Sequence, residues 1–423
     1  MVVAGEAMRS LSGRPRLGAM PLACVIGDLS LVRALGRRRI PVALVSSELQ
    51  PNASLSRYCL QVIQTPSWLE DPDGAVKALI DWSQRQDEQP VLFYQGDHDL
   101  LAVSRARALL APHVRCILPD AELVETLVDK IRFAELASER ELPVPTTRAL
   151  TAGPFLLSQI KSWRDFPCVL KPATRSPRFR AIGNDQKAVR ILDREMLERT
   201  MNALRKDDGP FVLQAAIEGG EDQIVSYHAY VRPGGDVVAQ FTGRKVRTAP
   251  RLYGYSSYIE ITEDPEVDAL GRQVLGALHF SGVAKVDFKR DARDGRLYLL
   301  EINPRFNLWH HPATVAGVCI PELVYRDAID PGSAPHARIT KPGVRWVSMR
   351  DDLWAMRQYR AAGELSLGEW AAQMTTVDVN ESFDLHDPVP GLVAFGKYFT
   401  QVMRRRLQGL LPAPARLASE APA

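Results

Sequence analysis

The chain has 423 residues, of which 46% are hydrophobic and 24% are charged. A chain of this size and composition can bury substantial cores, so we expect two or three domains and no extensive disorder. Its 53 basic and 50 acidic residues leave a net charge of +3, which is too near balance to indicate a nucleic-acid-binding protein. No run of apolar residues approaches the roughly 18 to 20 that a membrane-spanning helix needs.

The cysteines indicate the cellular compartment. They are Cys24, Cys59, Cys116, Cys168 and Cys319. None has C-x-x-C spacing and most lie in apolar runs, which is typical of reduced core residues, so we expect a cytoplasmic protein. Residues 1–20 carry three arginines among Gly, Ser and Pro without a continuous apolar run. They predict a disordered tail rather than a signal peptide.

Residues 21–120 predict a small N-terminal α/β domain. A strand at 22–26, a helix at 29–38 and a strand at 41–46 form a βαβ pattern, which is typical of a parallel sheet. The turn after the first strand lacks the glycines of a dinucleotide-binding fingerprint. NAD binding is therefore not expected.

A further strand in this domain, at 91–94, runs into the polar sequence Gln95–Asp99 and then into a helix at about 100–110. Loops that follow parallel strands are where such sheets bind ligands. Asp97 and His98 are therefore substrate candidates. The alternatives are that Asp97 caps the helix and that His98 begins it without any chemical role.

Two lysines follow this domain. Residues 123–147 predict a helix that ends before two prolines, with Lys130 beside Asp129 in its early part. Lys171 ends an apolar strand at 166–172, where lysine is uncommon and a buried ammonium needs an anion. Nucleotide phosphates are the natural candidates for that anion. A solvated Asp129–Lys130 ion pair and an edge-strand position for Lys171 are the alternatives.

The most informative stretch is a predicted hairpin. Two runs of alternating apolar residues between 283 and 302 flank a charged turn. Asp287 lies on the first strand, whereas Glu301 and Asn303 lie near the end of the second. Two carboxylates and an amide oxygen can thus converge on a Mg²⁺ ion that also carries nucleotide phosphates, with Arg305 beside it. A surface hairpin with solvated acids is the alternative.

The succession of these motifs resembles the ATP-grasp superfamily. It is most similar to the branch of predicted ATP-dependent carboxylate-amine ligases that includes D-aspartate ligases. The likeness covers about residues 20–400 and rests on the order D-K, P-x-P, V-L-K-P, F-V-L-Q-A-A-I-E-G-G-E-D, V-D-F and L-L-E-I-N-P-R. Asp351 followed by Trp354, and D-P-V-P at 387–390, resemble the closing region of that branch.

This resemblance implies an α/β fold in which an N-terminal Rossmann-like parallel-sheet domain precedes a two-lobed ATP-grasp domain. The implied parts are a disordered tail at 1–20, the N-terminal domain at 21–120, the ATP-grasp domain at 121–330 with a small lobe at about 145–215 and a large lobe at about 216–330, a C-terminal extension with a basic helix at 331–411, and a tail at 412–423.

The resemblance also implies roles for individual residues. The residues matched to the phosphate, adenine and ribose contacts of ATP are Lys130, Lys171, Gln214, Ala215, Ala216, Ile217 and Glu221. Asp287, Glu301 and Asn303 match the ligands of Mg²⁺, with Mn²⁺ as an alternative metal. Arg305 matches a residue that steadies the transferring phosphate, and Lys245 matches a basic residue near the γ-phosphate. For Lys245 a solvated basic loop is the alternative.

Two departures from the superfamily pattern stand out. The stretch 173–180 holds Arg175, Arg178 and Arg180 where many relatives have a glycine-rich loop. Side chains then replace backbone amides around the phosphates, or the loop is a disordered lid. Ala215 and Ala216 stand where a larger acidic and aromatic pair is usual, which leaves the side-chain packing on the nucleotide open.

The implied activity is the ATP-dependent joining of a carboxylate to an amine through an acyl phosphate, with release of ADP and phosphate. The alternatives are phosphoryl transfer to a hydroxyl and an inactive ATP-binding regulatory protein. The expected partners are a small-molecule carboxylate and a small-molecule amine, and no nucleic acid is expected. The protein is expected to be a monomer or a homodimer. Further substrate candidates are Arg247, Asn307, Trp309 and His310.

Residues 391–411 predict an amphipathic basic helix that includes Arg404, Arg405 and Arg406. Such a helix either makes weak contact with an anionic membrane surface or stays solvated.

Overall fold

A computed structural model describes residues 20–151, 156–173, 179, 188–204 and 209–410, with side chains omitted at 156 and from 401 onward. The predicted tails, apart from Met20, and the three arginines of the 173–180 stretch lie outside the described residues. The predictions made for them therefore stay predictions.

The N-terminal part contains the expected parallel sheet. Its strands are β1 (Ala23–Ile26), β2 (Val42–Ser46), β3 (Cys59–Gln64) and β4 (Val91–Tyr94), in the order β3-β2-β1-β4. All residues of β1 and β4 are buried, which explains why their apolar runs were visible in the sequence. Strand β3 was not predicted, because it is an edge strand with four of its six residues exposed.

Helices surround this sheet and lead into the next lobe. They are α1 (Leu29–Gly36), α2 (Pro72–Ser83), α3 (Asp97–Arg105), α4 (Arg107–Leu110), α5 (Ala121–Val128) and α6 (Lys130–Glu139), with a short 3₁₀ turn η1 (Asn52–Leu55) after β2. Asp129 separates α5 from α6, because its carboxylate accepts hydrogen bonds from the N–H groups of Ile131 and Arg132 and so caps a new helix. Lys130 consequently occupies the first position of α6.

The next two sheets are antiparallel. The small lobe consists of β5 (Thr147–Leu150), β6 (Cys168–Pro172), β7 (Val189–Ile191) and β8 (Phe211–Ala215), in the order β5-β8-β6-β7, with α7 (Leu156–Ile160) and α9 (Arg194–Ala203). The large sheet has the order β13-β12-β9-β10-β11-β14-β15, and only its last pair is parallel.

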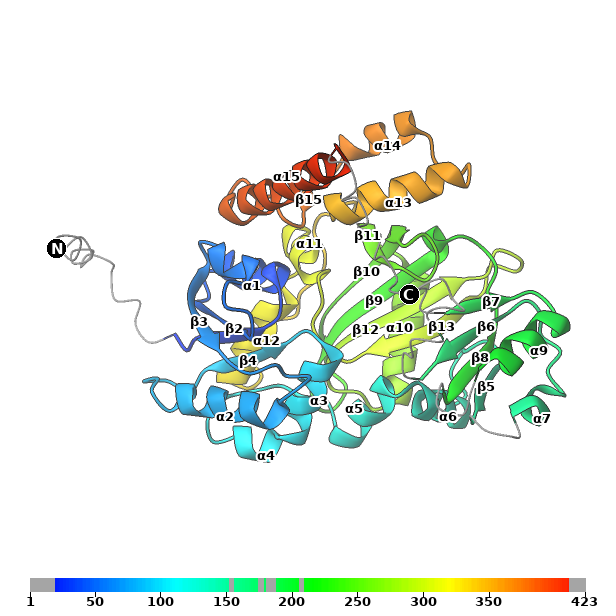
Figure 1. The fold of residues 1–423 in the computed structure, drawn as a ribbon. Coiled ribbons are helices and arrows are strands. Elements are labelled where there is room, and N and C mark those ends of the chain that lie inside the picture. Colours follow the sequence, from blue (N-terminus) through cyan, green and yellow to red (C-terminus); the bar gives the residue numbers. More distant parts are fainter. Residues whose placement is uncertain (1–19, 152–155, 174–178, 180–187, 205–208, 411–423) are drawn as a thin grey trace, which may run out of the picture.

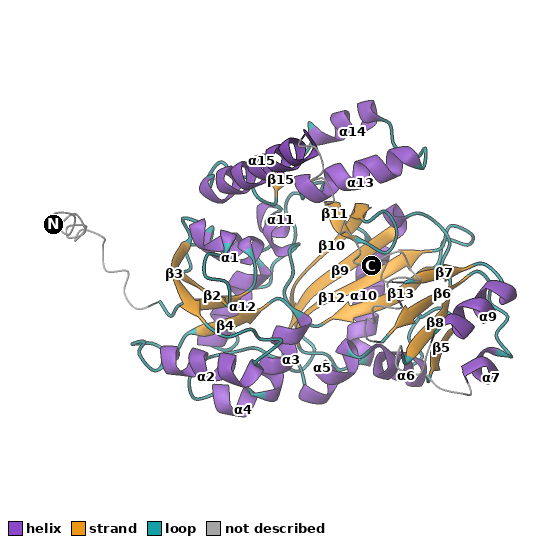
Figure 2. Ribbon diagram, in the orientation of Figure 1, coloured by secondary structure: helices purple, strands orange, loops and turns teal. Residues whose placement is uncertain are grey.

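The large sheet forms the centre of the molecule (Figures 1 and 2). Its strands are β9 (Ile224–Val231), β10 (Val237–Ala249), β11 (Tyr255–Thr262), β12 (Gly282–Arg290), β13 (Leu297–Asn303), β14 (Arg345–Val347) and β15 (Val379–Asn380), accompanied by η3 (Glu221–Gln223), α10 (Pro265–Ala277), α11 (His310–Val315) and α12 (Ile320–Ile329). The rings of Phe93 on β4 and Phe306 after β13 lie 5.1 Å apart in one shared core. The N-terminal domain is thus packed directly against the large sheet.

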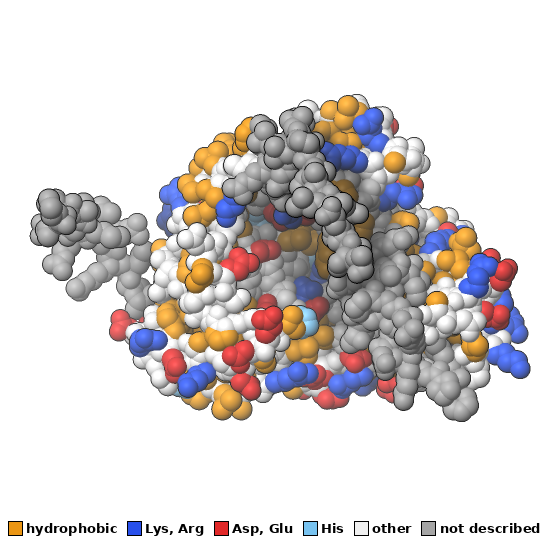
Figure 3. Space-filling view, viewed as in Figure 1, with side chains coloured by type: hydrophobic (Ala, Val, Ile, Leu, Met, Phe, Trp, Pro, Cys, Tyr) orange, Lys and Arg blue, Asp and Glu red, His pale blue; other side chains and the backbone are white. Residues whose placement is uncertain are grey.

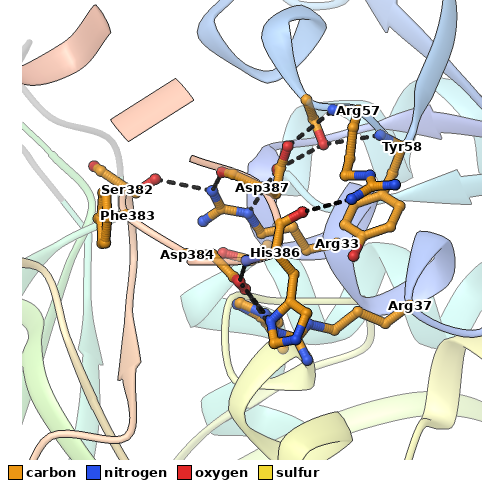
Figure 4. Close-up of polar contacts among 12 residues, drawn as sticks. Arg33, Arg37, Arg57, Tyr58, Ser382, Phe383, Asp384, His386 and Asp387 are labelled. Carbon is orange, nitrogen blue, oxygen red and sulfur yellow. Dashed lines mark hydrogen bonds and ion pairs between the residues drawn. The ribbon is translucent and has the colours of Figure 1, made fainter. Parts of the chain in front are cut away.

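The C-terminal extension covers both the N-terminal domain and the large sheet. Its helices are α13 (Met349–Ala361), α14 (Leu367–Met374) and α15 (Val389–Leu410), which lie along the upper edge of Figure 1. A buried ion pair joins this extension to α1, since Arg33 Nε lies 3.0 Å from Asp387 Oδ2 and their side chains are 0% and 1% exposed. Figure 4 shows this contact, in which Arg33 also donates to the carbonyl oxygens of Glu381 and Ser382.

The predicted α/β architecture is confirmed: a parallel-sheet domain precedes two antiparallel sheets. Strands β14 and β15 of the large sheet come from the expected C-terminal extension. Within the described residues, no helix is long and apolar enough to cross a membrane.

Removing the buried carboxylate of Asp387 should destabilise the fold. The Asp387→Ala variant leaves the Arg33 guanidinium buried without its anion, which costs about 3 to 5 kcal/mol in comparable buried pairs. Equilibrium urea unfolding measures the change. The matched control is Glu195→Ala, which removes the carboxylate of an exposed ion pair with Arg199 and should change the unfolding free energy little. Equal stability of the two variants would contradict the interpretation.

Candidate active site

The register of β12 and β13 places the predicted metal ligands on one face. Asp287 lies opposite Glu301, and Lys285 lies opposite Asn303. Because alternate residues of a strand share a face, all four side chains project to the same side. The pairing shifts after Asp287, so that Leu300 is an extra residue in β13. Without that bulge, Glu301 would face the apolar core instead.

Asp287 is held by two donors. Its side chain is buried, and it accepts hydrogen bonds from Ser226 Oγ and, at 2.6 Å, from Lys285 Nζ. Burial alone would raise the pKa of Asp287, but the charges of Lys285 and Lys245 together with these hydrogen bonds hold it well below the usual value. Asp287 is therefore an anion at neutral pH. The sequence analysis missed Lys285, although its K-x-D spacing puts it on the same strand face.

Arg305 connects the end of β13 to the N-terminal domain. Its Nη2 donates to Asn303 Oδ1 at 3.2 Å, and its Nε donates to Asp97 Oδ1 at 2.5 Å. Asp99, rather than Asp97, bonds back to the N–H of Gly96 at the start of α3. Asp97 therefore forms an ion pair with Arg305, and the alternative that Asp97 caps the helix does not apply.

Further contacts complete this end of the site. Asn303 Nδ2 donates to Glu301 Oε1 at 3.2 Å, while Glu301 itself is exposed. His98 is exposed in the first turn of α3. Asp97 in α3 and the end of β13 therefore lie at one place, although they are far apart in the sequence.

The two predicted phosphate lysines lie near each other. Lys171 Nζ donates to Gln214 Oε1 at 2.8 Å, whereas Lys130 Nζ donates to the carbonyl oxygens of Pro172 and Ala173 at 2.9 and 3.2 Å. Burial lowers the pKa of Lys171; Glu301 opposes this effect and the like charge of Lys130 adds to it. Two ammonium groups this close create a favourable position for an anion.

A pocket of about 180 Å³ brings these groups together. Its lining residues include Asp97, Lys130, Thr147, Lys171, Gln214, Leu300, Glu301 and Asn303. They come from the N-terminal domain, the linking helix α6, the small lobe and β13. The face drawn in Figure 3 is hollowed at its centre, with acidic and basic side chains along the walls.

The predicted hinge lies beside the pocket. Ala215 ends β8, and the N–H groups of Ala215 and Ala216 donate to the carbonyl oxygens of Thr146 and Pro167. Ile217 is buried at the end of this hinge. These two backbone N–H groups of the hinge therefore already form hydrogen bonds within the small lobe.

The ribose candidate and an unpredicted tyrosine lie next to the hinge. Glu221 is buried at the start of η3 and accepts a hydrogen bond from Thr248 Oγ1 at 3.3 Å. Tyr253 packs against Val169 and Ala216 and adopts a positive φ of 58°. The small alanine side chain leaves space for this ring, which gives a physical reason for the departure in the hinge sequence.

Two basic residues of β10 differ in their surroundings. Lys245 is partly exposed, and its charge acts on both Asp287 and Lys285. Arg247 is buried and donates to both carboxylate oxygens of Asp352 at 2.9 and 2.8 Å. Arg247 is not among the residues that line the pocket. In this structure it joins α13 to the large sheet.

The remaining substrate candidates are buried, and Trp309 lies on the same side of the large sheet as Lys285. Asn307, Trp309 and His310 are all buried, and Lys285 Nζ lies 5.5 Å from the centre of the Trp309 ring. Burial lowers the pKa of His310 to about 3, so its ring is neutral at physiological pH. None of the three lines the pocket, and within the described part of the chain the His310 ring nitrogens have no hydrogen-bond partner.

The donor set fits Mg²⁺ that arrives with nucleotide. The described residues contain no group of three or more His, Cys, Asp or Glu side chains that could hold a metal ion. Asp287, Glu301 and Asn303 offer two carboxylates and an amide oxygen. This set is an incomplete shell of oxygen ligands. Mg²⁺ in phosphoryl-transfer sites has such a shell, which phosphate oxygens and water complete.

Comparisons with known proteins point to one superfamily. Residues 235–350 match the family described as "ATP-grasp in the biosynthetic pathway with Ter operon". The D-aspartate ligase of Enterococcus faecium (strain Aus0004) is 24% identical over 303 residues, covering 69% of this chain and 71% of that protein. The chain belongs to the ATP-grasp superfamily. Its relationship to D-aspartate ligase is distant.

Solved ATP-grasp structures share the fold. An N5-carboxyaminoimidazole ribonucleotide synthetase in its ADP complex superimposes with a TM-score of 0.57 at 16% identity, covering 77% of this chain and 81% of that one. The L-amino acid ligase from Bacillus licheniformis gives a TM-score of 0.56 at 16% identity, over 74% and 75% of the two chains.

The lowered pKa of Lys171 predicts a pH dependence of nucleotide binding. The free protein should lose this ammonium at a lower pH than an ordinary lysine, so affinity for MgATP should already fall as the pH rises toward the usual lysine pKa of about 10.4. Lys171→Arg stays charged over that range and should show a flatter profile. Calorimetric titration at several pH values measures both. Lys161→Arg, an exposed change in the same lobe, is the control and should follow wild type. Superimposable profiles for wild type and Lys171→Arg would contradict the role of Lys171.

Proposed function

We propose that the protein is an ATP-dependent ligase that joins a carboxylate to an amine through an acyl phosphate. One observation carries the proposal: Lys130 and Lys171 share a single pocket with Glu301 and Asn303. A pocket that offers ammonium groups on one wall and oxygen ligands on another suits a metal-bound polyphosphate. The similarity to ligases of the same superfamily supports the same conclusion.

The proposed role of each residue follows from its charge. ATP brings roughly four negative charges, so phosphoryl transfer needs several cations around it. Lys130 and Lys171 would hold the phosphates, with Lys245 near the γ-phosphate. Asp287, Glu301 and Asn303 would hold Mg²⁺ or Mn²⁺, which neutralises charge on the phosphates. Lys285 keeps Asp287 ionised and fixed in position.

The proposed reaction has two steps. A carboxylate oxygen of the first substrate attacks the γ-phosphorus, the bond from that phosphorus to the β–γ bridging oxygen breaks, and ADP leaves. The amine nitrogen of the second substrate then attacks the acyl carbon, phosphate leaves, and the nitrogen loses a proton to give the amide. Arg305, held in one orientation by Asp97, presents a fork of donors suited to the carboxylate or acyl phosphate.

The substrate class that fits best is amino acids or their derivatives. The similar proteins include a D-aspartate ligase and an L-amino acid ligase. In this chain Asp97 and His98 would form the acceptor wall from the N-terminal domain. Hinge backbone and Glu221 would contact adenine and ribose, and buried Asn307, Trp309 and His310 would shape the substrate site from the layer beside Lys285.

Removing a metal-ligand charge should lower turnover strongly. Glu301→Gln should lower kcat by about 100-fold or more, because the charge that neutralises the metal is lost. The assay follows ADP release and the appearance of an amide mass from ATP, Mg²⁺ and amino-acid mixtures. Asp294→Asn, in the exposed turn of the same hairpin, is the matched control and should keep wild-type turnover. Full turnover of Glu301→Gln would overturn the metal assignment.

The products separate the ligase from other activities. An amide together with free phosphate supports the ligase. A phosphorylated hydroxyl compound would instead show a phosphotransferase. MgATP binding without ADP release across a broad substrate panel would show a nucleotide-binding protein without catalytic function.

A further inference from the structure

Helix α15 carries an apolar stripe that the described residues leave uncovered. Leu392, Phe395 and Phe399 are 60%, 69% and 56% exposed. Their spacing of three and four residues places them on one face of the helix. Val389 and Leu385, just before them, are also exposed. Figure 3 shows hydrophobic side chains along the upper left edge of the molecule, where α15 lies.

The charges of α15 all have the same sign. Its 22 residues include Lys397, Arg404, Arg405 and Arg406 and no aspartate or glutamate. Acids one turn away from these bases would stabilise the helix in water, and α15 has none. A basic helix that has an apolar stripe and lacks acids is typical of helices that lie in the interface of an anionic membrane.

The base of α15 is fixed rigidly to the body of the protein. Asp387 accepts hydrogen bonds from Arg33, from Ser56 Oγ at 2.8 Å and from the backbone N–H of Arg57 at 2.8 Å. Arg37 and Asp384 form a second ion pair at 2.7 Å (Figure 4). Because these contacts hold the residues directly before the helix, α15 leaves the protein at a defined point with its apolar stripe outward.

We propose that α15 binds the surface of membranes that contain anionic lipids. The stripe of Leu392, Phe395 and Phe399 enters the boundary between headgroups and acyl chains, and the net positive charge of the helix attracts it to anionic lipids. The helix lies on the membrane and does not cross it, in agreement with the absence of a spanning helix among the described residues. A second copy of the chain fits less well, because a twofold contact through this helix would bring like charges together.

Vesicle flotation with the full chain tests the proposal. Wild type should float with phosphatidylcholine vesicles that contain about 30% phosphatidylglycerol and much less with pure phosphatidylcholine. The double change Phe395→Ser and Phe399→Ser should lower the partition coefficient about tenfold or more. Changing Arg404, Arg405 and Arg406 to Gln should weaken binding to anionic vesicles by a similar factor.

A matched control removes two exposed leucines elsewhere. Leu109→Ser together with Leu192→Ser, which are 65% and 61% exposed outside α15, should float as wild type does. Unchanged thermal midpoints show that each variant is folded. The proposal is overturned if wild type fails to float with anionic vesicles, or if the phenylalanine variant floats equally well. It is also overturned if wild type dimerises without lipid and the phenylalanine variant does not, since the stripe is then a subunit interface.

Discussion

Lys285 and Asp287 lie two residues apart on one strand, and both side chains are largely shielded from water. Burying two charges costs free energy that their attraction offsets only when the geometry is close and further hydrogen bonds are made. Ser226 supplies such a bond. The pair thereby keeps an ionised carboxylate directly opposite Glu301 in the hairpin, where a neutral acid could not hold a divalent cation. The bulge in β13, which turns Glu301 toward the same side, adds the second carboxylate.

The pocket is assembled by contacts between distant parts of the chain. The Arg305–Asp97 pair brings the N-terminal domain to the end of β13, and the Lys171–Gln214 bond orders the small-lobe wall. The C-terminal extension is joined to the large sheet in the same way, because Asp352 on α13 binds Arg247 on β10. Polar contacts across these junctions give the domains a specific relative position, while the shared apolar core supplies most of the driving force.

Much of the fold could be predicted from the sequence, because β1, β4, β12 and β13 carry clear apolar patterns and their order matches one superfamily. Pairing details could not. The bulge at Leu300 has no local sequence signal, and Asp97 meets Arg305 across 208 residues. Arg247 was a substrate candidate, and no local pattern indicates that its partner is Asp352, 105 residues further along the chain. Tyr253 was missed because a loop residue gives no sign of which side chains it will contact.

The central claim is that Asp287, Glu301 and Asn303 hold a divalent cation together with nucleotide. Electron paramagnetic resonance of free Mn²⁺ tests it directly, with the metal titrated into protein in the presence and absence of a non-hydrolysable ATP analogue. We expect wild type to bind Mn²⁺ tightly only with the nucleotide, and the double variant Asp287→Asn and Glu301→Gln to lose that binding. Retention of wild-type Mn²⁺ affinity by the double variant would contradict the claim.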